Sequence, residues 1–400
     1  MQTERDRRPM PSWWWAAVPV LLAIVLWAYV GQHDPIDLKV YRMGGEFVWH
    51  RQASLYELHD FWLPFTYPPF AAVVFAPLAL LPPKAMIVAT YALSGAALIR
   101  ISVLVLRRLQ PDVTTTVAVL LTPLALLLDP VVSNFGFGQV NLLLAWLVLE
   151  DLLAPQERRW RGVGIGLAAG IKLTPAIFWL LLLATRQRRA AVVAPLTGIG
   201  TVLLGFAVLP RSSVTYWTTT IFDSGRIGTP YYLSNQSFTG ALARVLGEHT
   251  SVPWAVLSLV TVVVGIAGCA LRWRQGHVVE AVLGTELIAI LVSPVSWIHH
   301  LVWAWPILLL LVTAARTDVA ARVIAALWGI VTISQAIWKL PHENGRELTL
   351  HGWRIVAADT YTLLAVITLA WIVTRAVVAR RRSGTSSVDA PPAADAPTAD

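Results

Sequence analysis

Residues 253–272 read PWAVLSLVTVVVGIAGCALR, an apolar run that carries no charge until its final arginine. A run of this length can cross the hydrocarbon core of a bilayer as one helix. Because lipid offers no hydrogen-bonding partners, a spanning segment must satisfy its own backbone, either as a helix or as part of a closed barrel. The apolar residues are continuous rather than alternating, which excludes a barrel. The run therefore predicts a transmembrane helix.

Runs of the same kind recur along the whole chain. Only 14% of the 400 residues are charged, whereas a soluble protein carries about 25%. The predicted spans are residues 13–31, 85–106, 113–128, 138–154, 190–210, 253–272, 279–296, 299–315, 319–338 and 355–379. Two further apolar stretches, 66–83 and 162–185, are interrupted by proline or charge and predict broken or re-entrant segments. The sequence therefore predicts an all-α polytopic membrane protein with about 10–12 membrane helices.

Basic residues gather in short clusters between the apolar runs. They are Arg5/Arg7/Arg8, Arg107/Arg108, Arg158/Arg159/Arg161, Arg186/Arg188/Arg189, Arg272/Arg274, Arg316/Arg322 and Arg380/Arg381/Arg382. Such clusters mark the cytoplasmic ends of membrane helices. The net charge of +8 is therefore a topology signal, and nucleic-acid binding is not expected. One topology places every cluster in the cytoplasm, provided both broken stretches return to the side from which they entered.

This topology divides the chain into three parts. Residues 1–12 are a cytoplasmic N-terminal segment, residues 13–379 a multi-helix membrane domain, and residues 383–400 a cytoplasmic tail that is predicted to be disordered. The loops outside the cytoplasm are 32–65, 129–137, 211–251 and 339–354. Most polar residues without a role in topology fall in these loops or near the same face. We therefore expect a multi-pass protein of the cell membrane with its active site on the non-cytoplasmic face.

Four polar residues stand out in the first half of the chain. Asp37 follows the first predicted span closely and is either a general base for a sugar hydroxyl or a helix cap or solvated loop residue. Tyr67, in an aromatic and proline-rich stretch, either positions a ligand or anchors the loop at the interface. Gln139 and Asn141 enter an apolar run, so they bond either to neighbouring helices or to a substrate.

Lys172 lies inside an apolar stretch, well away from the nearest basic cluster. A charge at that depth is costly and is either functional or paired, with a carboxylate or a phosphate as its partner. The long loop 211–251 is predicted to be functional rather than disordered. It contains Arg226, Asn235 and Gln236, side chains that suit a polyol or phosphate ligand.

His299 and His300 lie at a tight turn that is predicted on the outer face. Adjacent histidines on a helix point about 100° apart, so they rarely bind one metal together. The single cysteine, Cys269, lies in an apolar run. We therefore expect no metal and no cofactor. A role in proton transfer or phosphate binding competes with a structural one, in which one histidine is packed and the other solvated.

Taken together, these residues resemble glycosyltransferase family 87, the actinobacterial membrane mannosyltransferases. The similar segments occur in the family's order from residue 37 to about residue 303. They are Asp37-Leu38-Lys39-Val40-Tyr41, Leu63-Pro64-Phe65-Thr66-Tyr67-Pro68-Pro69-Phe70, Gly138-Gln139-Val140-Asn141, Lys172-Leu173-Thr174-Pro175, Asn235-Gln236-Ser237 and Ser293-Pro294 through His300. The resemblance implies a GT-C fold with an active site that faces away from the cytoplasm. It also implies that Asp37 matches the family's essential aspartate and that His299 or His300 belongs to the site.

The resemblance implies a glycosyltransferase reaction as well. Mannose would pass from polyprenyl-phosphate-mannose to a lipid-linked mannoside, either a phosphatidylinositol mannoside or lipomannan and lipoarabinomannan, with inversion and an α-(1→2) linkage. The expected partners are this donor, a glycolipid acceptor and membrane lipids. Asp37 and His300 would be catalytic, and the residues expected to contact substrate are His299, Lys172, Arg226, Tyr67, Gln139, Asn141, Asn235 and Gln236.

A transporter or flippase of a lipid-linked sugar is the alternative to an enzyme. It would also have broken helices and a buried lysine. Transporters of that kind often show internal repeats, and none is apparent in this sequence.

Overall fold

The computed structural model describes residues 34–50, 54–57, 59–60, 63–153, 160–247 and 250–385. The predicted segment 1–12, the predicted first span and residues 386–400 of the predicted tail lie outside the described residues. The described chain is almost entirely helical, which confirms the all-α class. Its strands, within these ranges, are β1 (His59–Asp60) and β2 (Leu63–Pro64), which pair antiparallel.

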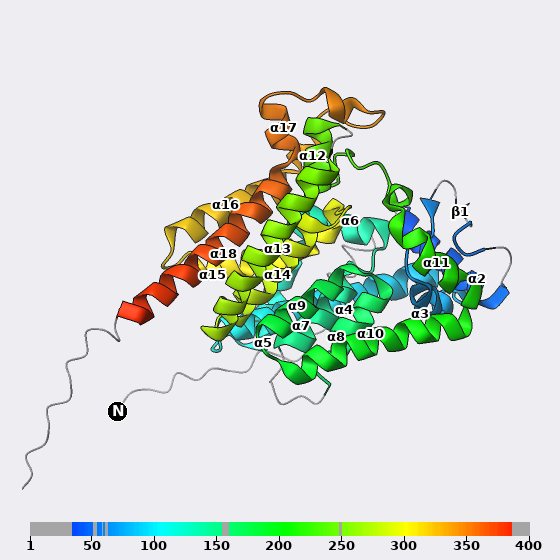
Figure 1. Cartoon of the computed structure of the whole chain (residues 1–400), viewed down its shortest axis with the longest axis horizontal. Helices are drawn as coiled ribbons and strands as arrows, with labels where there is room; N and C mark the ends of the chain where they lie inside the picture. Colours follow the sequence, from blue (N-terminus) through cyan, green and yellow to red (C-terminus); the bar gives the residue numbers. More distant parts are fainter. Residues whose placement is uncertain are drawn as a thin grey trace, which may run out of the picture.

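The helices follow one another with short connections (Figure 1). Up to residue 137 they are α2 (Ile36–His50), α3 (Pro69–Ala79), α4 (Pro83–Leu109), α5 (Thr115–Leu121), η1 (Thr122–Leu127) and α6 (Asp129–Phe137). Between residues 141 and 246 they are α7 (Asn141–Leu153), α8 (Val163–Ile171), η2 (Thr174–Ile177), α9 (Phe178–Ala184), α10 (Arg188–Val208), α11 (Pro210–Thr218), η3 (Thr220–Phe222), η4 (Ser224–Ile227) and α12 (Phe238–Leu246). The last are α13 (Ser251–Arg274), α14 (Val278–Val292), η5 (Ile298–Trp303), α15 (Ala304–Ala314), α16 (Val319–Ser334), η6 (Ala336–Lys339), η7 (Arg346–Thr349), α17 (Trp353–Ala358) and α18 (Thr360–Thr385).

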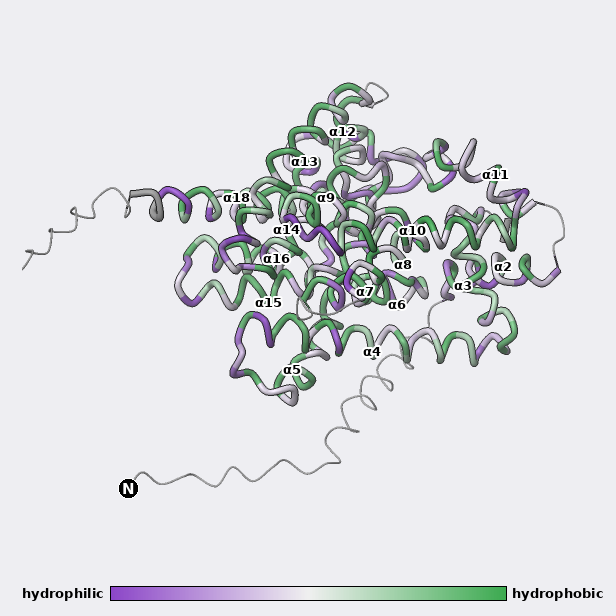
Figure 2. The backbone as a smooth tube through the Cα atoms, turned by 60° about the horizontal axis from the view of Figure 1, so that its bottom comes forward, coloured by the Kyte–Doolittle hydropathy of each residue, from purple (hydrophilic) through white to green (hydrophobic). Residues whose placement is uncertain are grey.

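Four described helices are long and apolar enough to cross a membrane. They are α4, α10, α13 and the part of α18 up to Arg381. In Figure 2 the tubes of α10 and α13 are predominantly hydrophobic, and their outward side chains are apolar and exposed. The predicted span 113–128 differs from expectation, because α5 and η1 together are bent by 81° against α6. The prolines at 123 and 130 interrupt this stretch, since proline cannot donate to a helix ladder.

Several other predicted spans are shorter helices. The apolar helices of 10 to 17 residues are Pro69–Ala79, Thr174–Ala184, Ile298–Ala314 and Val319–Ser334. By length and composition the described residues therefore hold four full spans, or five with the bent pair. The expected 10–12 helices also included short and broken segments and the span 13–31, which lies outside the described residues.

Both stretches that were predicted to be broken are broken. In the first, Pro69 starts the short helix α3 and Pro83 starts α4. In the second, α8 ends at Ile171, Lys172 has an extended backbone, and a new helix begins at Thr174. Pro175 explains this restart, because its ring and missing N–H do not allow an uninterrupted helix. The break leaves Lys172 at a helix end among apolar elements.

Two packed groups of helices build the molecule. One contains α13, α14, α16 and α18, and the other contains α3, α4, α7, α8 and α10. The glycines of α8 allow close packing on α10: a Cβ on Gly166 would lie 2.5 Å from the carbonyl oxygen of Ala194. At one end of the first group, α12 and α17 lie together above the membrane-length helices (Figure 1).

A buried ion pair joins α12 to the start of α18. Arg244 donates from Nε to Oδ1 of Asp359 at 3.0 Å and also bonds the backbone carbonyls of Tyr231, Tyr232 and Asn235. Its side chain is fully buried. A buried charge that loses its partner is far more costly than the intact pair is stabilising.

We therefore predict that Arg244→Ala lowers the free energy of unfolding by about 3–5 kcal/mol, because Asp359 is left as an unpaired buried charge. Thermal unfolding of the purified protein in detergent measures the change. The control is Arg211→Ala, at an exposed position in α11. Equal melting temperatures for the two variants would contradict the assigned role of the pair.

Candidate active site

Asp37 lies in the first turn of α2 and is half-buried. Because the helix already begins at Ile36, Asp37 is inside it rather than at its cap. Its carboxylate is turned toward the side chain of Gln139. Burial raises the pKa of this carboxyl to about 6, while a hydrogen bond with Gln139 and the charge of Lys172 act in the opposite direction.

The turn between α6 and α7 brings Gln139 and Asn141 to α2. Gly138 in this turn has φ +69°, a conformation that favours glycine. A Cβ there would lie 2.6 Å from the Cβ of Leu38, so a larger residue would push α2 and Asp37 away. Glycine at this position is therefore a condition for the contact between Asp37 and Gln139.

The amide of Gln139 is fixed by its neighbours. Its Oε1 accepts the hydroxyl of Tyr41 at 2.8 Å and Nδ2 of Asn141 at 3.3 Å. These bonds leave the NH₂ group of Gln139 for Asp37. Tyr41 also bonds the hydroxyl of Tyr67 at 3.0 Å. The expected residues Tyr67, Gln139 and Asn141 are therefore brought to Asp37.

Lys172 reaches the same cluster from the break after α8. Its Nζ donates to Oδ1 of Asn141 at 2.9 Å and lies 2.9 Å from Nε2 of His300. It also lies 5.8 Å from the centre of the Tyr67 ring. Lysine has three N–H donors, and two are used by these partners. The third has no hydrogen-bond partner among the described residues and can bind an anion.

The two histidines occupy different surroundings. His300 bonds Lys172, whereas His299 packs its ring against Phe137, with ring centres 5.1 Å apart. The backbone carbonyl of His299 accepts Nδ2 of Asn141 at 3.0 Å. Among the described residues, Nε2 of His299 is buried without a hydrogen-bond partner. His300 therefore faces the cluster through its side chain, and His299 holds Asn141 through its backbone.

Asn235 and Gln236 do not line the cluster. Both are completely buried. Oδ1 of Asn235 accepts the backbone N–H of Ser296 at 2.9 Å, and the N–H of Gln236 donates to the carbonyl of Ser296 at 2.8 Å. The Gln236 side chain also donates to the carbonyl of Ala358 at 2.8 Å. These residues fix the segment before η5, and through it the position of the histidines.

Arg226 also lies apart from the cluster. It is half-buried in η4, and its Nη2 donates to the backbone carbonyl of Tyr56. The hydroxyl of Tyr56 in turn donates to the carbonyl of Tyr67 at 2.9 Å. Arg226 therefore supports the wall that carries Tyr67 and makes no direct contact with Asp37 or Lys172.

Two residues of the cluster were not selected from the sequence. Tyr41 belongs to the segment that begins at Asp37, and its position one helical turn later could have drawn attention to it. Glu286, in α14, lines a cavity of about 30 Å³ together with Asn141, Lys172 and His300. A carboxylate inside an apolar run was the available signal for Glu286.

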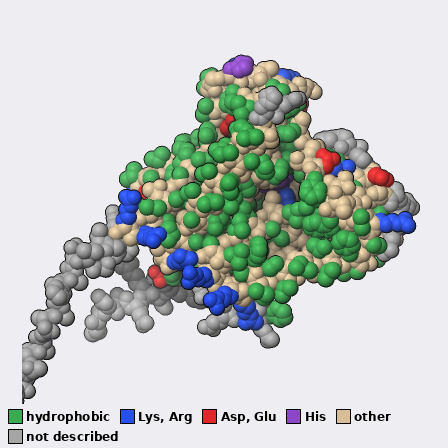
Figure 3. Space-filling view, viewed as in Figure 1, with side chains coloured by type: hydrophobic (Ala, Val, Ile, Leu, Met, Phe, Trp, Pro, Cys, Tyr) green, Lys and Arg blue, Asp and Glu red, His purple; other side chains and the backbone are tan. Residues whose placement is uncertain are grey.

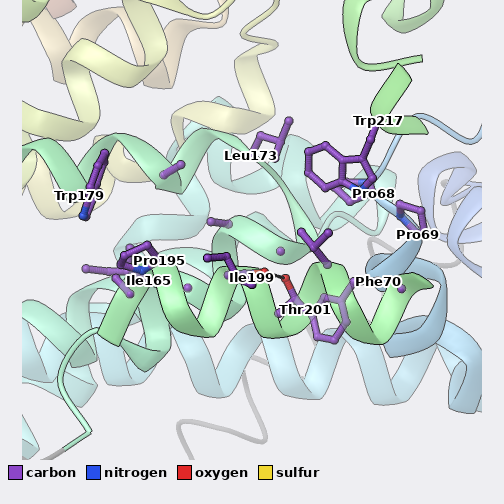
Figure 4. A pocket seen from close by; sticks show the side chains of 18 residues that line it. Pro68, Pro69, Phe70, Ile165, Leu173, Trp179, Pro195, Ile199, Thr201 and Trp217 are labelled. Carbon is purple, nitrogen blue, oxygen red and sulfur yellow. Dashed lines mark hydrogen bonds between the residues drawn. The ribbon is translucent and has the colours of Figure 1, made fainter. Parts of the chain in front are cut away.

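An apolar groove of about 260 Å³ adjoins the polar cluster, between α8 and α10. Figure 4 shows Trp179 toward one end of the groove and Trp217 with Pro68 toward the other. Two lining residues, Leu173 and Pro68, directly follow Lys172 and Tyr67 in the chain. Figure 3 shows the surface hollowed between α13 and α11, with a basic side chain inside the hollow.

The chemistry of this arrangement follows from its three parts. A half-buried carboxylate with a pKa near 6 can accept a proton at neutral pH. A lysine with a free N–H can hold an anion, and the groove can hold an alkyl chain. Within the described ranges, no three His, Cys, Asp or Glu side chains are grouped so as to hold a metal ion.

The chain is similar to known proteins along most of its length. The model of glycosyltransferase family 87 matches residues 65–294. A polyprenol-phosphate-mannose-dependent alpha-(1-2)-phosphatidylinositol mannoside mannosyltransferase of Mycobacterium tuberculosis is 34% identical over 409 residues, covering 95% of each chain. A protein of the same name from Mycolicibacterium smegmatis is 35% identical and covers 90% of this chain and 89% of its own.

One solved structure is also similar. The crystal structure of ArnT from Cupriavidus metallidurans bound to undecaprenyl phosphate aligns with 96% of this chain and 82% of its own, at 17% identity and a TM-score of 0.40.

Proposed function

Because this chain belongs to glycosyltransferase family 87, we propose that it is a membrane mannosyltransferase that uses polyprenyl-phosphate-mannose and forms an α-(1→2) linkage on a phosphatidylinositol mannoside. Relatives named for this reaction match the chain over nearly its full length. Lipomannan and lipoarabinomannan are other acceptors of the same chemical class. The relatives are named for sugar transfer, which favours an enzyme over a transporter or flippase.

The main support for this proposal is that the carboxylate of Asp37 and the ammonium group of Lys172 lie in one cluster beside an apolar groove. Asp37 and Lys172 interact across the amides of Gln139 and Asn141. A polyprenyl-linked sugar phosphate has three parts in a matching order: an alkyl chain for the groove, a phosphate for the cation, and a sugar next to the carboxylate. We infer that the polyprenyl chain lies between α8 and α10, with its phosphate at Lys172.

The reaction then needs one base and one anion-binding group. Asp37 accepts the proton of the acceptor hydroxyl while the hydroxyl oxygen bonds to the anomeric carbon of mannose. The bond from that carbon to the phosphate oxygen breaks on the opposite face, so the configuration inverts. Lys172 stabilises the negative charge that develops on the departing polyprenyl phosphate. His300 orients Lys172 through its Nε2 and so places the cation for this step.

We also infer that the site faces away from the cytoplasm, in the cell membrane. The basic residues in the last turns of α4 and α13 lie at helix ends, as cytoplasmic signals do. In Figure 3 basic side chains gather along one edge of the molecule, away from the hollow. This separation supports a reaction centre on the other side of the membrane.

Removal of the Asp37 carboxylate tests the base directly. Asp37→Asn and Asp37→Ala should each lower turnover by roughly 10²–10⁴-fold, because neither side chain can take the hydroxyl proton. Transfer of radiolabelled mannose from polyprenyl-phosphate-mannose to a phosphatidylinositol mannoside in membranes measures this. Asp34→Asn, an exposed carboxylate three residues earlier, is the matched control and should retain activity. Turnover like that of the wild type in Asp37→Asn would remove Asp37 from the mechanism.

The pKa of Asp37 sets the pH dependence. Burial raises this pKa to about 6. Only the deprotonated carboxylate can act as a base, so turnover should rise as pH increases through about 6 and level off above about 7. Turnover at saturating donor and acceptor, measured across this range, gives the profile. A rate that stays constant between about pH 5 and pH 7 would contradict the assignment.

Filling the groove should weaken donor binding. Gly198 lines the groove, and a Cβ there would have its nearest neighbour at 4.0 Å, so Gly198→Leu is expected to fold and to occupy the space of the polyprenyl chain. The donor KM should rise roughly tenfold, with turnover at saturation nearly unchanged. Gly200→Leu is the control, because Gly200 is exposed on the same helix with nothing within 4 Å of its Cβ position. An equal KM for both variants would place the chain elsewhere.

A further inference from the structure

Glu286 is a buried carboxylate in the middle of α14 that the proposed mechanism does not use. Its side chain is only 9% exposed, and its neighbours in α14 are buried as well. In the described part of the chain no hydrogen bond holds this carboxylate. It lines the cavity of about 30 Å³. A carboxylate in such a place is costly unless a positive charge compensates it.

The positive charge that faces Glu286 is Lys172. Both side chains line the same cavity, and their charges attract each other. The other ionisable groups around Lys172 are Asp37 from α2, Tyr67 from the segment before α3, and His299 and His300 from η5. Of these only Asp37 adds a second negative charge. Lys172 therefore interacts with two carboxylates, Asp37 from α2 and Glu286 from α14.

Asp37 and Glu286 differ in what they do during mannose transfer. Asp37 becomes neutral when it takes the hydroxyl proton, so it stops compensating Lys172 at the moment when the leaving phosphate gains charge. Glu286 takes no part in the proton transfer of this arrangement and lines the cavity beside Lys172. A second carboxylate beside Lys172 would help to keep the ammonium protonated in the empty site, where no phosphate is present to do so.

We propose that Glu286 is a positioning residue that holds Lys172 charged and oriented in the cavity until the phosphate of the donor binds. This inference rests on the proposed function, because it takes polyprenyl-phosphate-mannose as the donor. Without Glu286, Lys172 keeps Asp37 as its counter-charge in the empty site, and binding of the phosphate must supply more of the energy that keeps Lys172 protonated. Loss of Glu286 therefore lowers the affinity for the donor, whereas the rate of the chemical step in the saturated complex stays nearly the same.

Glu286→Gln tests the proposal because it keeps the shape of the side chain and removes its charge. The donor KM should rise roughly tenfold, and turnover at saturating donor should stay within about threefold of the wild type. Glu286→Asp restores the charge and should recover most of the donor affinity. Thr285→Val is the control, because Thr285 is buried in the same helix, bonds the carbonyl of Ala281 at 2.8 Å and the thiol of Cys269, and does not line the cavity.

Three results would overturn the proposal: an unchanged donor KM in Glu286→Gln, a fall in that KM, or a loss confined to turnover. A fall would mean that Glu286 repels the phosphate rather than preparing Lys172. If Glu286→Gln alone does not fold, Lys172→Met combined with Glu286→Gln removes both charges and should fold with a melting temperature near that of the wild type. Failure of the double variant to fold would also overturn the proposal.

The same experiment separates this inference from the function on which it rests. Wild-type protein that transfers no mannose would contradict the proposed function. The charge pair would still be tested by the melting temperatures of the single and double variants, since these need no substrate. Wild-type transfer together with an unaltered Glu286→Gln variant would contradict the charge pair alone.

Discussion

The ammonium group of Lys172 is a positive charge among apolar helices, and its compensation is the constraint on which the rest of the site depends. An unpaired charge in such surroundings is costly, so the chain must bring partners to it. Asn141 comes from α7 and His300 from η5, each 2.9 Å from Nζ. These partners are themselves held by buried residues elsewhere, because Asn235 and Gln236 fix the backbone that leads into η5. One charge therefore links three parts of the chain that are far apart in sequence.

Breaks in the helices allow these residues to gather around Lys172. Helix α8 ends before Lys172, and Pro175 lies in the first turn of the next helix. The side chain of Lys172 therefore projects from a helix end instead of from the lipid-facing side of a continuous helix. Gly138 lets α2 approach the turn between α6 and α7, which sets Asp37 beside Gln139. The close packing of α8 on α10 leaves a groove whose lining begins next to Lys172. A polar centre at the mouth of an apolar groove is the arrangement that a lipid-linked sugar phosphate requires, which is why the proposed reaction fits this fold.

The helix break and most of the polar cluster could be predicted from the sequence, because charged residues and prolines within apolar runs are visible in it. The break at Lys172 and the gathering of Asp37, Tyr67, Gln139, Asn141 and His300 follow from polar residues that have no place in lipid. The number of complete spans could not be predicted, because hydropathy does not separate a short helix from a crossing one. The roles of Asn235 and Gln236 were also out of reach: an amide that binds backbone looks the same in sequence as one that binds sugar. Glu286 could be recognised in the sequence as a charge in an apolar run, but its place in one cavity with Lys172 depends on how α14 packs.

Asp37 and its cluster should form a site that is open to the non-cytoplasmic side of the membrane. The chain offers a simple measurement, because its single cysteine, Cys269, is buried. Asp37→Cys and Arg316→Cys would be treated in intact cells with a small membrane-impermeant thiol reagent, Arg316 being an exposed residue between α15 and α16 at the predicted cytoplasmic end. Asp37→Cys should be modified from outside, more slowly when polyprenyl phosphate is added, and Arg316→Cys should react only after the cells are made permeable. Modification of Asp37→Cys only after permeabilisation would contradict it.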